Sequence, residues 1–122
     1  MRRFKLNPVA KPRMTQSDKW KMRPNVMRYR AYCDELRYLA GMWKVPAGGM
    51  TIVFRLPMPR NWRKREKEAR RGQPHQQKPD IDNLLKGFLD ALCEDDSYVY
   101  DARAMKCWDD VGAIEVYEKE AA

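Results

Sequence analysis

Acidic residues and a lysine gather in one stretch of the sequence, in a pattern suited to phosphodiester chemistry. Asp80 and Asp82 stand at the expected start of a helix, and Lys86 follows one turn later. A second acidic group, Glu94-Asp95-Asp96, comes soon after that helix should end. Mg²⁺ prefers oxygen ligands, often a few carboxylates plus a substrate phosphate, and can generate a nucleophile from water. Carboxylates from both places are therefore candidate metal ligands, and the lysine is placed to stabilise developing charge.

The same residues also have a purely structural interpretation. Asp80 is a good helix N-cap, and Asp82 complements the helix dipole and is spaced to pair with Lys86, each effect being worth about 1 kcal/mol or less. Two residues apart inside a helix, carboxylates point in nearly opposite directions. Pro79 disfavours helix for the residue before it, so Asp80 should lie just outside the helix, in extended geometry. From there both carboxylates can turn toward one point.

The net charge of +8 is unevenly distributed along the 122 residues. Residues 1–78 carry 21 Lys and Arg against 5 Asp and Glu, a balance of +16, whereas residues 79–122 carry 4 against 12, a balance of −8. A basic body joined to an acidic cluster indicates phosphate binding by the first part and cation binding by the second.

The stretch of residues 60–78 is strongly basic and is the candidate DNA-binding arm. We expect a basic loop at about 60–79 that contacts the DNA backbone; a merely solvated loop is the alternative. Trp62 within it is placed to stack on an unpaired base at a branch point. The residues expected to bind DNA, two of them from an early basic loop, are Lys11, Arg13, Arg60, Arg63, Lys64, Arg65, Arg70, Arg71 and Lys78.

The hydrophobic pattern predicts the elements that must position these side chains. Apolar residues at spacings of three and four predict one helix after Pro24 and another over residues 80–93. Apolar and β-branched or aromatic patterns predict strands over residues 3–9, 50–58, 98–108 and 113–117. The expected fold class is α+β, with two helices packed on a small mixed, mostly antiparallel four-stranded sheet. The length fits a single domain over residues 1–122.

Composition argues against several other classes of protein. The single histidine, His75, nearly excludes a His-based metal site or a Ser-His-Asp triad. Three widely spaced cysteines without a CxxC pair suggest neither a disulfide framework nor a structural zinc site. No apolar run approaches the ~20 residues of a membrane helix, and the basic N-terminus lacks the apolar stretch of a signal peptide. We therefore expect a cytoplasmic protein without a membrane partner.

The stretch that begins at Asp80 resembles the RusA-type Holliday-junction resolvases. That family carries Asp-x-Asp-Asn-Leu-x-Lys at a helix start and an Asp-Asp pair before a strand, and the matching runs here are Asp80–Lys86 and Asp95-Asp96. The similarity continues through Phe88–Leu92. The resemblance implies a dimeric, Mg²⁺- or Mn²⁺-dependent endonuclease, typically encoded by phages and prophages, that resolves four-way junctions in DNA recombination and repair. It implies metal binding and catalysis by Asp80, Asp82 and Asp96, with Lys86 as the essential lysine.

Two other interpretations fit part of the pattern. Pro79-Asp80 with a downstream acid and lysine faintly resembles restriction-like nucleases, but those place an acid-x-lysine on a strand, and no such strand is predicted. A non-catalytic DNA- or RNA-binding module, such as a phage regulator, accounts for the +16 segment. It gives no reason for the carboxylates and Lys86 to occur together. A cleavage assay on branched DNA, with and without Mg²⁺, separates these interpretations.

Overall fold

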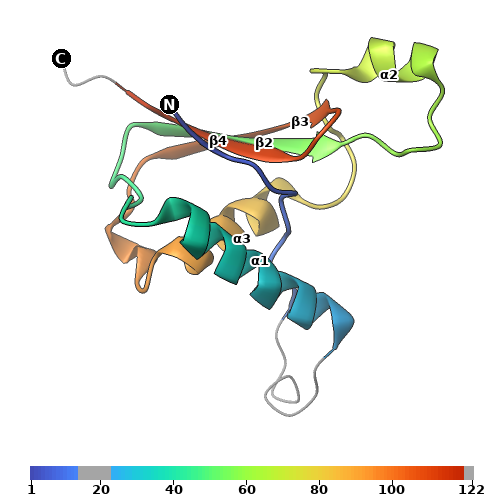
Figure 1. Cartoon of the computed structure of the whole chain (residues 1–122). Coiled ribbons are helices and arrows are strands. Elements are labelled where there is room, and N and C mark those ends of the chain that lie inside the picture. Colours follow the sequence, from blue (N-terminus) through green and yellow to red (C-terminus); the bar gives the residue numbers. More distant parts are fainter. Residues whose placement is uncertain (14–22, 120–122) are drawn as a thin grey trace.

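The computed structural model describes residues 1–13 and 23–119 of the chain. One sheet forms the centre of this structure (Figure 1). Within the described residues, no helix is both long enough and apolar enough to cross a membrane. In chain order the elements are β1 (Arg2–Phe4), α1 (Pro24–Ala40), β2 (Met50–Pro57), α2 (Lys64–Arg70), α3 (Ile81–Leu92), a 3-10 turn (Asp96–Tyr98), β3 (Ala102–Asp109) and β4 (Ala113–Glu118).

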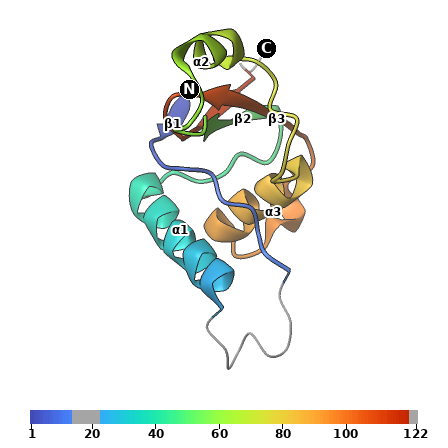
Figure 2. The ribbon, with the colours of Figure 1, turned by 90° about the vertical axis from the view of Figure 1, so that its right-hand side faces the viewer.

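The sheet is mixed and mostly antiparallel, as predicted. Its strand order is β1-β4-β2-β3, with β4 antiparallel to both of its neighbours and β2 parallel to β3. Because two parallel strands need a crossover connection, the chain must traverse the molecule between β2 and β3. That crossover contains α2 and α3. Helices α1 and α3 lie side by side on one face of the sheet, whereas α2 lies on the opposite side (Figure 2).

Phe88 fixes the position of α3 on the sheet. Its ring meets those of Phe4 and Phe54 edge to face, with centroids 6.1 and 6.2 Å apart, and all three residues are buried. Phe54 belongs to the inward row of β2, which takes every second residue from Met50 to Leu56. Burial of a side chain of this size is worth about 1.5–3 kcal/mol. This cluster therefore sets the rotation of α3 and the direction of its first turn.

The N-terminal segment crosses α3 closely at Gly87. A Cβ at this position would lie 3.0 Å from Lys11 N and 3.1 Å from Val9 O, so a side chain here would press on the crossing backbone, and glycine lets it pass undisturbed. Lys11 N donates to Asn83 O at 3.1 Å, and Tyr29 Oη donates to Gly87 O at 2.9 Å. The crossing brings Lys11 onto α3, where it forms an ion pair with Asp90.

Three predicted features differ from the structure. In the described part of the chain the α-helices number three rather than two, because Lys64–Arg70 forms α2 inside the predicted loop. Its residues have high helix propensity, but none is buried, so α2 lacks the apolar periodicity by which the other helices were predicted. The strand predicted over 3–9 is confined to Arg2–Phe4, because the chain leaves the sheet to cross α3. The strand predicted over 98–108 starts at Ala102, because a 3-10 turn precedes it.

Candidate active site at the start of helix α3

The chain enters α3 through Asp80, whose side chain does not cap the helix. Asp80 is extended, with φ −70° and ψ 145°, and its carbonyl accepts a hydrogen bond from Leu84 N at 3.1 Å. Its carboxylate makes no hydrogen bond to the first turn, so the capping role that its position suggested is wrong for this side chain. Asp80 and Asp82 are both exposed. Two carboxylates are therefore open to a ligand where the helix begins.

Lys86 pairs with Asp90 and Asp96. The i,i+4 spacing had suggested a pair with Asp82, and within the described chain that pair is not formed. Lys86 Nζ lies 3.3 Å from Asp90 Oδ1 and 3.3 Å from Asp96 Oδ2. Hydrogen bonds to these carboxylates, Asp90 first, raise the pKa of Lys86 above its ordinary value. The lysine is therefore a full cation at neutral pH, held between one acid on its own helix and one beyond the helix end.

A short 3-10 turn positions Asp96. The Asp95 carboxylate accepts a hydrogen bond from Ser97 N at 2.9 Å where this turn starts, and that bond lowers the pKa of Asp95. Tyr98 Oη donates to Val45 O at 2.8 Å where the turn ends. Asp95 thus begins the turn that presents its neighbour Asp96 to α3.

The three candidate metal ligands suit a hard cation in chemistry but do not converge. Among residues 1–13 and 23–119, no three Asp, Glu, His or Cys side chains lie close enough together to hold a metal ion. Like charges repel, so carboxylates gather at one point when a cation offsets their charge. The exposed Asp80 and Asp82 and the half-buried Asp96 supply the oxygen ligands that Mg²⁺ and Mn²⁺ prefer. The residues therefore fit such an ion by donor type.

Lys106 is a further residue of the site that the sequence patterns did not single out. It lies on β3 opposite Phe54, in the row that faces the helices. Its Nζ donates to Pro79 O at 2.8 Å and also to Gln77 O. These bonds hold the segment that leads directly into Asp80. A lysine at an inward position of an alternating strand is the signal by which the sequence could have revealed it.

The comparison with protein families decides the class of protein. Residues 5–117 match the family model described as endodeoxyribonuclease RusA. The chain belongs to the RusA family. Membership confirms the resemblance seen in the sequence and implies a DNA endonuclease of the kind that acts on Holliday junctions. Neither the curated proteins nor the solved structures gave a significant match.

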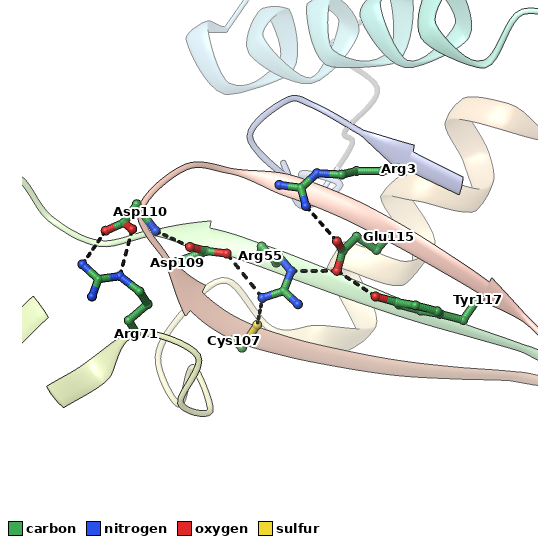
Figure 3. A network of polar contacts seen from close by, with 8 residues as sticks. All are labelled: Arg3, Arg55, Arg71, Cys107, Asp109, Asp110, Glu115 and Tyr117. Atoms are coloured by element: carbon green, nitrogen blue, oxygen red, sulfur yellow. Dashed lines mark hydrogen bonds and ion pairs between the residues drawn. The ribbon is translucent and has the colours of Figure 1, made fainter. Parts of the chain in front are cut away.

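A polar network ties the strands together on the outer face of the sheet of this RusA-family chain (Figure 3). Glu115 is 3% exposed, and its carboxylate accepts hydrogen bonds from Arg3 at 2.9 Å and from Arg55 at 2.7 Å. Arg55 also pairs with Asp109 at 3.3 Å. A buried carboxylate is tolerable when it is paired in this way. The network joins all four strands near the point where the basic arm leaves the sheet.

Residues 60–71 form the outer part of the predicted arm and are here called the basic arm. This segment is fixed at its root and exposed beyond it. Arg71 donates through Nε and Nη2 to the Asp110 carboxylate at 2.8 and 2.9 Å, a pair visible in Figure 3. Gly72 N donates to Trp108 O at 2.8 Å. Trp62, the residue predicted to stack on a base, packs on Trp108, with ring centroids 4.8 Å apart, and remains partly exposed. The root is therefore rigid, whereas α2 itself carries no buried residue.

The structure places the expected DNA-binding residues in different settings. Lys11 forms an ion pair with Asp90 on α3, and the Arg70 guanidinium lies 5.9 Å from the centre of the Trp62 ring. Among the described residues, no ion pair engages the other exposed cations of this set, which are Arg13, Arg60, Arg63, Lys64, Arg65 and Lys78. Arg63–Arg65 therefore form a run of three exposed cations on the arm that no described acid engages.

Proposed function

We propose that this RusA-family chain is a Mg²⁺-dependent endonuclease, with Mn²⁺ as an alternative ion, that resolves four-way junctions and related branched DNA in recombination and repair. The observation that carries the proposal is the 3.3 Å contact between Lys86 and Asp96, formed on the helix whose first turn exposes Asp80 and Asp82. Asp80, Asp82 and Asp96 would hold the ion, which when bound would supply an activated water and neutralise developing negative charge. The chain would act in the cytoplasm of a bacterial host, encoded by a phage or prophage.

The remaining residues of the site act through charge and position. Lys86, a cation held beside the acidic ligands, is placed to orient the attacking water or stabilise charge on the scissile phosphate. Asp90 holds its Nζ from one turn further along α3. Lys106 keeps the approach to Asp80 in place through Pro79 O. The basic arm and Lys78 would bind flanking phosphates and give affinity without sequence preference.

The proposal is tested by incubating the full-length protein with a labelled four-way junction and with a linear duplex of the same sequence. We expect cleavage near the branch point of the junction when Mg²⁺ or Mn²⁺ is present, no cleavage in EDTA, and little on the linear duplex. Binding measured in EDTA on the same DNA is the control. Tight junction binding with no cleavage in either metal would contradict the endonuclease and support a non-catalytic DNA-binding module.

We further propose that the protein acts as a homodimer. A C2 dimer places one active site on each of two equivalent strands of a junction. The outer face of the sheet has partly exposed apolar side chains such as Met105 and Tyr117, which offer material for an interface. Sedimentation at micromolar concentration should give the dimer mass. A monomer both free and on DNA would overturn this part of the proposal.

A further inference from the structure

A cavity of about 420 Å³ opens beside the segment that leads into Asp80. Its lining includes Pro79, the residue directly before that aspartate. The buried residues that form its floor are Pro8, Leu56, His75 and Trp108. Its exposed rim carries the amides Asn7, Asn25 and Gln77 and the cations Arg28 and Lys78. Among the described residues, no acidic side chain lines this cavity.

His75 is the unusual member of the floor. It is 5% exposed, its ring lies 4.2 Å from that of Trp108, and its backbone N donates to Lys106 O at 3.1 Å. Its ring Nδ1 has no hydrogen-bond partner among the described residues. Burial, followed by the charge of Lys106, lowers the pKa of His75, so its imidazole is neutral at pH 7. A buried ring nitrogen without a partner is costly, and a ligand that bonds to it relieves that cost.

The lining suits a neutral heteroaromatic ring attached to an anion. Trp108 and His75 lie in its floor with only their edges exposed, the rim amides can bond the polar edge of such a ring, and the rim cations match a phosphate. A second cavity also touches His75, but its cations are engaged inside the protein, Arg55 by Glu115 and Lys106 by backbone carbonyls. The first cavity is therefore the one that matches a nucleotide.

We propose that this cavity, the His75 pocket, receives a nucleobase that leaves the stack beside the scissile phosphate, and that His75 discriminates between bases. The inference rests on the proposed nuclease function and deepens it. Bases at a branch point are the least costly to extrude, because part of their stacking is already absent. The chain position of Pro79 and Asp80 puts the pocket next to the residues proposed to act on the phosphate.

The first test measures base extrusion without cleavage. The full-length protein is bound, with Ca²⁺ in place of Mg²⁺, to junctions that carry 2-aminopurine at successive positions around the branch point. We expect the fluorescence to change severalfold at one position as the base leaves the stack, and to stay constant at positions further along the arm. Binding with no fluorescence change at any position overturns the pocket, whether or not the protein is a nuclease.

The second test measures discrimination by His75. After the cut site is mapped in Mg²⁺, each flanking nucleotide is replaced by the four bases and by an abasic residue. We expect the abasic residue at one position to slow cleavage about tenfold. Rates should differ between bases at that position by about fivefold, the worth of one hydrogen bond. His75→Phe keeps a ring but removes its nitrogens. In this variant the cleavage rates for the four bases should become equal, while the abasic substrate should still be cut more slowly.

Tyr32→Phe is the matched control, because Tyr32 Oη is another buried polar atom without a partner and Tyr32 does not line the His75 pocket. It should keep the base preference of the wild type. Equal preference in wild type and His75→Phe, at equal melting temperature, overturns the role of His75. Failure of the wild type to cut any junction refutes the nuclease instead, and the fluorescence test then decides the pocket on its own.

Discussion

Helix α3 and the basic arm follow one another in the chain and are built in opposite ways. α3 buries five of its twelve residues and is held further by the ion pairs of Asp90 with Lys11 and Lys86. The helix of the arm, α2, buries none of its residues. Chemistry at a metal requires side chains within a fraction of an ångström of their working positions. Attraction of DNA phosphates requires only charge within reach.

The difference predicts where substitutions act. Changes at the start of α3, or at Lys106, which holds the segment before it, should alter rate and spare affinity, whereas changes on the arm should alter affinity and spare rate. Asp80, Asp82 and Lys106 test the first half of this statement, and Arg63–Arg65 test the second.

The largest effect is expected from Asp80→Asn and Asp82→Asn. Each change removes a charged ligand and keeps the shape of the side chain, so cleavage in Mg²⁺ should fall roughly a thousandfold or more. Junction affinity should stay the same or rise, because negative charge near the phosphate is removed. Asp34→Asn, at an exposed aspartate on α1, is the control and should cleave normally. Full cleavage by both site variants would end the catalytic assignment.

Lys106→Met should slow cleavage by about ten- to a hundredfold, because the carbonyl of Pro79 loses the ammonium that holds it and Asp80 shifts. More Mg²⁺ should be needed for half-maximal rate, junction affinity should change less than twofold, and Lys106→Arg should restore much of the rate. The measurement is a Mg²⁺ titration of single-turnover cleavage together with thermal melting. An unchanged Mg²⁺ dependence would show that Lys106 does not position the site.

Replacing Arg63, Lys64 and Arg65 together with Ala should weaken binding to all DNA. The slope of log affinity against log salt should flatten by about 0.9 for each phosphate that the arm no longer neutralises. Stability should change by less than about 0.5 kcal/mol, because α2 has no buried residue. Lys44→Ala, in an exposed loop on another part of the chain, is the control. An unchanged salt slope would mean that the arm does not touch DNA.

The smallest effect concerns the Lys11–Asp90 pair. Burial alone would raise the pKa of Asp90, but hydrogen bonds and charge from Lys11 and Lys86 outweigh it and lower that pKa. The pairs therefore stabilise the fold above the ordinary pKa of Asp, near 4, and the effect disappears as pH falls through the lowered value. Lys11→Met should cost about 0.5–1 kcal/mol at pH 7. Urea unfolding should show this cost fading below pH 4; a cost independent of pH would refute the electrostatic account.

The sequence by itself determined the features that depend on local spacing. The apolar repeat through Leu84 and Phe88 and the proline before Asp80 predicted α3 almost to its ends. Alternation from Met50 predicted β2. The split of charge between residues 1–78 and 79–122, and the acidic motif, predicted a DNA-cutting protein, and the family match confirmed the endonuclease class. These features can be predicted from the sequence because the hydrophobic repeats of helices and strands involve residues that are close together in the chain.

Only the tertiary structure decided which charges meet. Asp82 and Asp90 both stand four residues from Lys86, so the spacing alone could not decide between them. The turn that starts at Asp95 brings Asp96 to Lys86 as a partner, whereas Asp82 forms no pair with it in the described part of the chain. Lys106 reaches the carbonyl of Pro79 because β3 lies parallel to β2 across a long crossover, a pairing that no local pattern encodes. α2 escaped prediction because it buries nothing, and its helix follows from backbone propensity alone. Contacts between distant segments depend on how the sheet and helices pack, so the sequence could nominate the site residues but could not assemble them.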